Sequence, residues 1–546
     1  MSMKKSQHTK PRRSIAMIAA LVVGLSMALA ACGGGDSSEG GAGTTSLVIG
    51  NWQDPASLDP GAITENSMNW VVYSMFDPLV WAVADDDGEP SYVSGLAESW
   101  ESSDDMSSWT FKLREGVTFH DGTALDANAV KATFDRIVDP NFSSTKGKAL
   151  LAAYKQTVVV DDMTVRVELT GPSASFLDAV ASPQLVIVSP QALQDYSNDL
   201  STHPVGTGFM KLDSFTKGDS LVVTRNPDYA WGPDGVWSKD STIEKLTFRF
   251  LPDQQARGNA LRSGAVDLSN RLSPQDAGTF QKDSAFTHYP AVARGVNYSL
   301  VLNTSRAPFD DLRVRQAIFY AIDRKQLVDT LGGGAFTLAQ SIVSSAVEGY
   351  DPDSQDPYPY DLDKAKSLLD EAGWVLENGV RQKDGQTMKL ELISVDGFGM
   401  ESAGPYVQEL LKTELGIEVD VSSMKYPAIS EVANAGNLDI TNYSFLSLNA
   451  LVTYQTTWDT SQIEAGFNYS HFSDPELDDK VRAIEAIADP TARSQQWKEV
   501  FDTVAQAAVH LPMWELTGDW YSAVGDVKGL AFSPLDGSPY FHGVGS

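Results

Sequence analysis

Cys32 is the only cysteine among the 546 residues, so no disulfide within the chain can support its fold. Five basic residues, Lys4, Lys5, Lys10, Arg12 and Arg13, precede an apolar run from Ile15 to Ala30. A basic start, an apolar stretch and small residues at its end are the layout of a secretory signal. We therefore expect residues 1–31 to be a signal peptide. The exported body must then be stabilised by burial of its core, which a chain of this length can supply.

The residues around Cys32, Leu29-Ala30-Ala31-Cys32, resemble a bacterial lipobox, in which the thiol is diacylated and the cysteine becomes the new N-terminus. The alternative is an incidental thiol in an ordinary signal peptide or a membrane helix. A run of about 16 apolar residues is short for a helix that crosses a membrane. We expect lipidation at Cys32, export by the Sec route, and a lipid anchor on the outer face of the cytoplasmic membrane, at the cell surface or in the periplasm.

Residues 32–46 are expected to form the lipidated N-terminus and a flexible linker, because their composition is dominated by Gly, Ser and Thr. Removal of residues 1–31 takes away five basic and no acidic side chains, which changes the formal net charge from −31 to −36. This acidity argues against nucleic acid as a partner, since phosphates require basic side chains. A solvated acidic surface explains the charge better than a cationic ligand does.

Short predicted strands and helices alternate along the body, which indicates an α/β protein of more than one lobe. The strands are expected at 47–51, 109–113, 157–160, 164–169, 185–189, 221–225, 245–250, 296–303, 388–395 and 417–421. Apolar residues at helical spacing predict helices over 311–330, 361–372 and 491–509. The first of these carries Val314, Ala317, Ile318, Ala321 and Ile322 on one stripe.

Sequence signatures of catalysis and of metal binding are absent. No serine has glycine two residues before and two residues after it, and Gly147-Lys148 continues with alanine, which excludes a P-loop. No two histidines of the exported body stand at metal-ligand spacing on one helix, and no thiol supports them. We expect no enzyme activity, no cofactor and no metal, which favours a binding protein.

Four ordered segments resemble one family, the family 5 extracellular solute-binding proteins of ABC importers, which include dipeptide-, oligopeptide- and nickel-binding members. The segments are Leu96–Ile137, His203–Gly232, Asn303–Leu327 and Tyr360–Trp374. The resemblance extends from about Leu47 to the C-terminus. It implies a two-lobed fold like that of periplasmic binding proteins (type II, cluster C-like), with an extra domain inserted in the first lobe and closure about a hinge.

Carried onto this chain, the resemblance divides it into three parts. Lobe one would comprise residues 47–80, 200–272 and 505–546, the inserted domain residues 81–199, and lobe two residues 273–504. It further implies a monomer that captures a small-molecule or peptide ligand between the lobes and delivers it to an ABC permease with its ATPase subunits. The alternatives are a ligand sensor for a membrane signalling receptor, which the same fold could serve, and a secreted hydrolase.

The ligand site implied by the resemblance departs from the peptide-binding members. Those place an aspartate, which pairs with the α-amine, in the loop that follows the motif matched by Leu438-Asp439-Ile440. The corresponding loop here, Thr441–Asp459, has no acid before Asp459. Because a buried ammonium without a carboxylate is costly, recognition of a free amine is not expected.

The same loop supplies Tyr443, Asn449, Tyr454 and Trp458, and the resemblance places Asn51 and Trp52, at the end of the first strand, in the cleft. We take these six residues as the candidate ligand-binding residues. Rings and amides suit a neutral ligand that stacks and forms hydrogen bonds, such as a sugar oligomer or a modified peptide. The alternative for each ring is a place in the core.

Overall fold

The computed structural model describes residues 45–63, 66–85, 90–353, 356–395, 402–464 and 466–545. Residues 43–546 form one compact unit. The signal peptide, Cys32 and nearly all of the linker lie outside the described residues, so export and lipidation stay predictions. In the part of the chain that is described, no helix combines the length and the apolar character that a membrane span needs.

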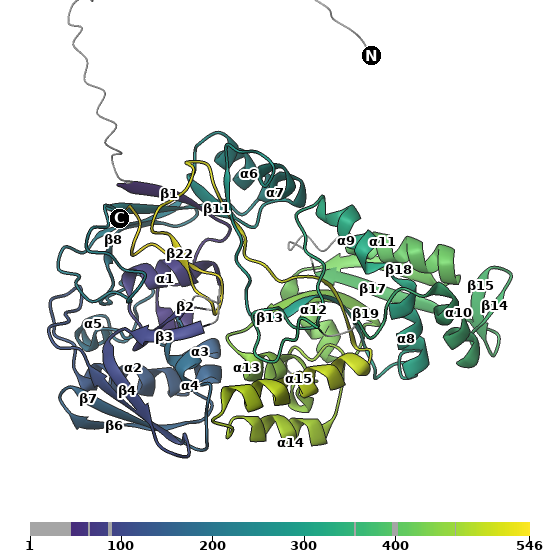
Figure 1. Ribbon diagram of the computed structural model, residues 1–546, viewed down its shortest axis with the longest axis horizontal. Coiled ribbons are helices and arrows are strands. Elements are labelled where there is room, and N and C mark those ends of the chain that lie inside the picture. Colours follow the sequence, from purple (N-terminus) through teal and green to yellow (C-terminus); the bar gives the residue numbers. More distant parts are fainter. Residues whose placement is uncertain are drawn as a thin grey trace, which may run out of the picture. The chain divides into compact units, whose positions relative to one another are not determined.

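The first lobe contains a seven-stranded sheet in the order β12-β21-β11-β1-β10-β9-β8 (Figure 1). The strands are β1 (Ser46–Asn51), β8 (Met210–Thr216), β9 (Ser220–Arg225), β10 (Lys245–Phe250), β11 (Leu268–Asn270), β12 (Thr287–Tyr289) and β21 (Trp520–Ser522). β1 runs parallel to both of its neighbours, β10 and β11, and the other pairs are antiparallel. The carboxyl ends of β1 and β11 therefore meet at one edge of the sheet.

The hydrophobic core of this lobe combines residues from the first strand with residues from late in the chain. Leu47 and Ile49 of β1 alternate inward and pack with Leu246, Phe248 and Trp520 in one buried cluster. The helices of the lobe are α1 (Asn69–Met75), α6 (Gln254–Arg262) and α7 (Pro274–Phe280), and β22 (Ala531–Phe532) pairs with β23 (Pro539–Tyr540). A further pair, β2 (Val80–Ala84) with β3 (Pro90–Ser94), packs with the core of the segment predicted to be inserted.

A four-stranded antiparallel sheet, in the order β4-β5-β7-β6, lies within the segment predicted to be inserted. Its elements are β4 (Ala97–Ser102), β5 (Ser108–Leu113), α2 (Ala127–Val138), α3 (Thr145–Leu150), β6 (Tyr154–Asp161), β7 (Thr164–Leu169), α4 (Phe176–Val180) and α5 (Pro190–Asp195). Phe111, Phe134 and Val165 belong to its own hydrophobic core. A buried ion pair between Arg136 of α2 and Asp59 joins it to the first lobe.

The second lobe contains a five-stranded sheet in the order β18-β17-β19-β13-β20. The strands are β13 (Gly295–Leu302), β17 (Lys389–Val395), β18 (Glu418–Met424), β19 (Ile440–Leu446) and β20 (His510–Trp514), and a small sheet adds β14 (Val375–Glu377), β15 (Val380–Lys383) and β16 (Gln386–Thr387). The helices are α8 (Leu312–Ala321), α9 (Arg324–Gly332), α10 (Leu362–Glu371), α11 (Ala403–Leu410), α12 (Tyr426–Asn434), α13 (Ala450–Thr457), α14 (Pro475–Ile484) and α15 (Pro490–Gln506). β17, β18 and β19 are parallel, so their carboxyl ends share an edge.

Two segments connect the sheets, residues 290–294 between β12 and β13, and residues 515–519 between β20 and β21. They lie side by side, because Val292 bridges Thr517 and the N–H of Ala293 donates to the carbonyl of Leu516 at 3.1 Å. The chain thus changes sheet later than the expected boundaries at 273 and 505: α7 and β12 lie with the first sheet, and β20 lies in the second. The division into three domains is otherwise kept as a prediction.

Two predicted elements differ from the structure. The segment predicted as a strand at 185–189 is buried but pairs with no strand of the described residues. The N–H of Ile187 donates to the loop carbonyl of Asp77 at 3.2 Å, and that of Val188 to the hydroxyl of Thr133 at 3.3 Å. The helix predicted over 311–330 is two helices, α8 and α9. Ile322 has extended backbone angles, and the Asp323 carboxylate accepts from the N–H of Gln326 at 2.9 Å, which starts a new helix.

Candidate ligand site

Two buried asparagines mark the edge at which β1 and β11 end. Asn51 is fully buried and donates from Nδ2 to the carbonyl of Ser67 at 3.1 Å. Its Oδ1 has no hydrogen-bond partner among the described residues, and neither has Oδ1 of Asn270, which ends β11 and is 4% exposed. Buried polar atoms normally have a partner, so two unpaired acceptors on adjacent parallel strands indicate a place where a ligand or water binds.

The close approach of these strands depends on Gly50. A Cβ atom at Gly50 would lie 2.8 Å from Oγ of Ser269, so a larger residue would push β1 away from β11. In an open α/β sheet, ligands bind beyond the carboxyl ends of the strands where successive connections leave in opposite directions. β1 lies at such a point in this sheet, because its neighbours on the two sides, β10 and β11, both run parallel to it. The topology thus favours this edge as a ligand site.

Trp52 continues the same edge beyond β1. Its half-buried ring lies beneath the guanidinium of Arg271, whose Cζ is 4.5 Å from the ring centroid. The indole Nε1 of Trp52 and Oδ1 of Asp54 are buried without a hydrogen-bond partner in the described ranges. The edge therefore presents one hydrogen-bond donor, several hydrogen-bond acceptors, and a guanidinium that lies over an indole ring. These groups suit a ligand that carries both hydrogen-bond donors and acceptors.

Asn270 and Arg271 were missed by the sequence reasoning. β11 has three residues, and only its parallel pairing with β1 brings its end beside Asn51. One local signal existed, since residues 266–269 alternate apolar and polar side chains shortly after a glycine, which is the pattern of a short strand. Arg271 also has a left-handed backbone (φ 48°), which is uncommon for a side chain of its size.

Tyr443, Tyr454 and Trp458 lie in the interior of the second lobe. Their rings are at most 1% exposed, Tyr443 donates its hydroxyl to the carbonyl of Phe467 at 3.0 Å, and Tyr454 donates to Asp478 at 2.8 Å. Tyr443 and Trp458 are brought together around the imidazole of His510, with ring centroids 5.7 and 5.3 Å from it. In this structure they support the sheet and α13 from within.

Asn449 has a structural contact on each of its amide atoms. It is the N-cap of α13, where its Oδ1 accepts from the N–H of Val452 at 2.9 Å. Its Nδ2 lies 3.5 Å from Oδ2 of Asp178 in the inserted domain. The structure thus brings only Asn51 and Trp52, among the six candidates, to the edge of the first sheet, and a ligand contact of the other four is untested.

The carboxylate at the end of the loop 441–459 is already engaged. Oδ1 of Asp459 accepts from the N–H and the hydroxyl of Ser461, at 2.9 and 2.6 Å, and so caps the short helix that follows. Asp439, before the loop, accepts from the N–H of Glu391 at 2.9 Å and lies 3.4 Å from Arg306. Both carboxylates are engaged within the second lobe, and the expectation that this loop does not recognise an ammonium stays a prediction.

Three stacked rings of the second lobe lie beside the crossing segments. Tyr298 of β13 stacks on Trp514, the last residue of β20, with centroids 5.1 Å apart. Trp514 in turn stacks on Phe336 at 4.7 Å. Trp514 is directly followed by the segment 515–519, so this stack is fixed to the connection between the sheets. Tyr298 and Phe336 are half-buried, Trp514 is buried, and none of the three lies in the loop 441–459.

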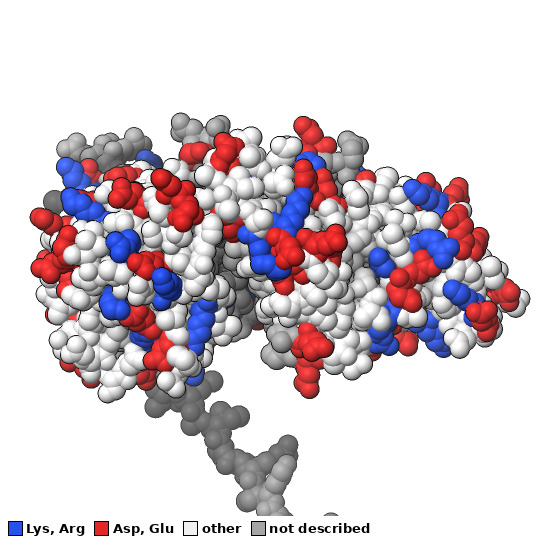
Figure 2. Space-filling model, turned by 90° about the horizontal axis from the view of Figure 1, so that it is seen from below, with Lys and Arg blue, Asp and Glu red and all other residues white. Residues whose placement is uncertain are grey.

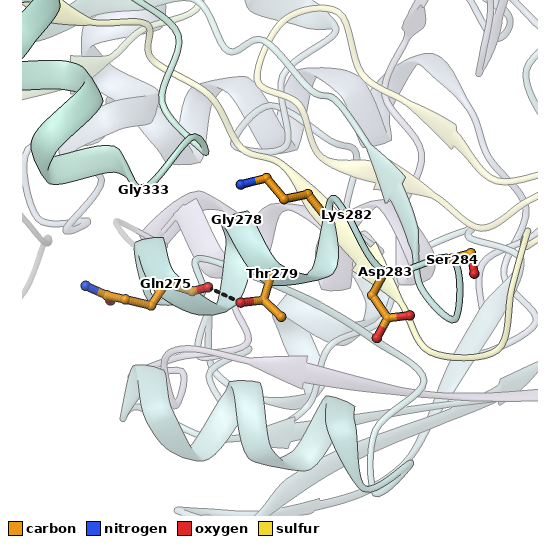
Figure 3. A pocket seen from close by; sticks show the side chains of 7 residues that line it. All are labelled: Gln275, Gly278, Thr279, Lys282, Asp283, Ser284 and Gly333. Carbon is orange, nitrogen blue, oxygen red and sulfur yellow. Dashed lines mark hydrogen bonds between the residues drawn. The ribbon is translucent and has the colours of Figure 1, made fainter.

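An open depression of about 670 Å³ lies where α7 of the first lobe meets the end of α9 of the second (Figure 3). It is lined by Gln275, Gly278, Thr279, Lys282, Asp283, Ser284 and Gly333. The two lobes touch closely here, because a Cβ atom at Gly278 would lie 2.8 Å from the carbonyl oxygen of Gly333. None of the six candidate residues lines this depression, and we assign it no ligand.

In the described part of the chain, neither the distribution of charged side chains nor a group of metal-binding side chains indicates another site. Acidic and basic side chains are interspersed over the face drawn in Figure 2. Within the described ranges, no three His, Cys, Asp or Glu side chains are grouped so that they could hold a metal ion. The edge formed by β1 and β11 therefore remains the best-supported candidate site.

The sequence profile of the bacterial extracellular solute-binding proteins, family 5 Middle, matches residues 91–461. The glutathione-binding protein GsiB of Escherichia coli O1:K1 is 28% identical over 476 residues, 86% of this chain and 88% of that protein. NikA from Brucella suis, in complex with Fe(III)-EDTA, superposes with a TM-score of 0.80 at 26% identity and covers 92% of this chain and 99% of its own. The periplasmic binding protein DppA from Helicobacter pylori, in complex with the peptide STSA, superposes with a TM-score of 0.73 at 22% identity, over 92% and 98%. These similarities confirm the predicted family resemblance and the two-lobed α/β fold.

Proposed function

The chain belongs to the bacterial extracellular solute-binding proteins of family 5, and from this we propose that it delivers a modified peptide or another peptide-like solute to an ABC permease and its ATPase subunits. Proteins of this family are the substrate-binding parts of ABC transporters and are not enzymes. The proposed cycle is closure of the lobes on the ligand by rotation in the two crossing segments, followed by docking of the closed form on the permease.

The observation that carries the ligand class is the set of unpaired polar atoms at the edge of the first sheet. The amide oxygens of Asn51 and Asn270 can accept hydrogen bonds from donors on the ligand, and the indole N–H of Trp52 can donate to an acceptor on the ligand. Peptide bonds supply both, and hydroxyl groups of a sugar oligomer do so as well. The engaged carboxylates around the loop 441–459 support a ligand whose α-amine needs no acid in that loop.

Glutathione is the first ligand to test, because the similar protein GsiB is named for binding it. Its α-ammonium is free and would need an acceptor outside the loop 441–459. The chain from Gly33 onward should be purified, and native mass spectrometry should be used to identify any solute that co-purifies. Thermal-shift and calorimetric titrations then compare glutathione, an unmodified dipeptide and a sugar oligomer, since a bound ligand raises the melting temperature by mass action.

Trp52→Ala should weaken binding of the ligand so identified at least tenfold, because it removes both the ring and its indole N–H. Trp374→Ala is a matched control: that ring is also half-buried, and Nζ of Lys383 lies 6.0 Å from its centroid on the second lobe. Equal losses in both variants would contradict the proposed site. Tight binding of the unmodified dipeptide, with glutathione inert, would contradict the proposed ligand class.

The membrane anchor is a separate part of the proposal. We place the protein outside the cytoplasm as a monomer, held by a diacylated Cys32 on the outer face of the membrane. A tether keeps the released receptor near its permease, so the raised local concentration replaces very tight docking.

A further inference from the structure

The inserted domain touches the second lobe through a buried carboxylate. Asp178 of α4 is 7% exposed, and its Oδ1 accepts from the hydroxyl of Tyr92 at 2.6 Å within the inserted domain. The same oxygen lies 2.9 Å from Nη1 of Arg294, and Nδ2 of Asn449 lies 3.5 Å from Oδ2. One side chain thus connects three parts of the molecule that are far apart in the sequence.

Arg294 gives this contact its significance, because it is the last residue of the crossing segment 290–294. Its Nη1 also donates to the carbonyl of Leu448 at 2.8 Å, and its own carbonyl accepts from the N–H of Ser447 at 2.9 Å. Rotation of the lobes requires backbone changes in the crossing segments. A carboxylate that holds Arg294 from the side of the inserted domain therefore opposes that rotation.

A second contact lies at the turn between α14 and α15. Oε2 of Glu485, a residue 6% exposed, accepts from the N–H and the hydroxyl of Ser175 at 3.2 and 2.7 Å. The N–H of Ala174 donates to the carbonyl of Glu485 at 3.2 Å. Figure 1 shows α4 beside these helices of the second lobe. Arg493 of α15 pairs with Glu348 at 2.9 Å within the second lobe.

These contacts can influence the orientation of the second lobe relative to the first, because the inserted domain is itself fixed to the first lobe. The buried pair of Arg136 and Asp59 joins the two, and Arg136 donates from Nη1 at 3.0 Å. We propose that Asp178 and Glu485, with their partners, form a brace by which the inserted domain biases the lobes toward the arrangement seen here, independently of any contact with ligand. A ligand then shifts an equilibrium whose resting position the brace has set.

The test uses ligand-free protein, so its outcome is independent of the proposed function. Bound solute is removed by unfolding in guanidinium and refolding, and the chain from Gly33 onward is studied by small-angle X-ray scattering and hydrogen exchange. Asp178→Asn with Glu485→Gln should change the radius of gyration, because the lobes are then free to leave the arrangement that the brace holds. The same pair of changes should accelerate exchange of the Ala293 amide, which bonds across the two crossing segments, several-fold.

Asp135→Asn is the matched control. Asp135 accepts from the hydroxyl of Tyr154 at 2.7 Å and pairs with Lys131, but within the inserted domain alone. The proposal is overturned if the brace variant, folded by circular dichroism, keeps the parent's radius and exchange rates, or if the control changes them equally. Should the double variant fail to fold, Ser175→Ala, which removes one donor to Glu485, is judged by the same two outcomes.

Discussion

Two buried histidines should make the folded protein lose stability as the pH falls from 7 to 5. His510 of β20 and His542 near the C-terminus are at most 1% exposed, and no nitrogen of either ring has a hydrogen-bond partner among the described residues. Burial alone lowers the pKa of each imidazole to about 3. The folded state therefore keeps both rings neutral at pH 5, whereas the unfolded chain protonates them.

The sign and size follow from proton uptake. Below a pKa of about 6.5 the unfolded state binds more protons than the folded state, so the free energy of unfolding falls as the pH falls. Between pH 7 and pH 5, a folded pKa of about 3 gives a loss of about 2 kcal/mol for each histidine. Together, His510 and His542 should cost the folded state about 4 kcal/mol at pH 5.

The measurement is urea unfolding followed by tryptophan fluorescence at both pH values, for the parent and for His510→Leu. Carboxylates contribute to the pH dependence too; burial raises the pKa of Asp77 to about 6, which acts in the opposite direction. The carboxylates contribute equally in the parent and in the variant, so their contributions cancel when the two losses of unfolding free energy are compared. His510→Leu should lose about 2 kcal/mol less than the parent between the two pH values.

His203→Leu is the control, because it removes a histidine whose side chain is exposed rather than buried. The reasoning is refuted if parent and His510→Leu lose the same free energy between pH 7 and pH 5, because the buried imidazole would then not resist protonation.

Two further predictions concern the anchor and the junction of the inserted domain. Cys32→Ser should release the protein into the medium and weaken uptake in cells while leaving ligand affinity unchanged; a lower affinity of the purified variant would mean that anchor and receptor are not separable. Arg136→Met should cost about 3–5 kcal/mol in urea unfolding, because it leaves the Asp59 carboxylate buried without its cation. Lys131→Met, which breaks an exposed pair with Asp135, should cost less than about 1 kcal/mol, and equal losses would contradict the role of burial.

The sequence predicted best where local signals decide the structure. The helix predicted over 361–372 is α10. The Asp361 carboxylate caps it by accepting from the N–H of Lys364, and Gly373 follows it with φ 86°. Gly333 likewise ends α9 in the left-handed conformation. In each case one side chain or one backbone angle is sufficient, and no distant contact is needed to read it.

The candidate site could be predicted only in part, because it depends on strand order. Asn51 and Trp52 follow a strand that is recognisable from its residues alone. Asn270 becomes their neighbour only through the parallel pairing of β11 with β1, which no local pattern encodes. For the rings of Tyr443 and Trp458, the residue type gave no basis for choosing between a cleft and a core environment. Aromatic side chains suit a cleft and a core equally well, and the packing of β19 and α13 around His510 decided their place.

The position of β21 has a consequence for the order in which the lobes can be assembled. β11 and β12 do not pair with each other, because β21, which begins at Trp520, lies between them. A chain that leaves the cytoplasm with its N-terminus first presents β1, β10 and β11 early but fills this gap only when its final segment arrives. The four strands of the inserted domain all lie within residues 97–169 and can pair long before that. The lobe that the chain begins first is thus the one that it completes last.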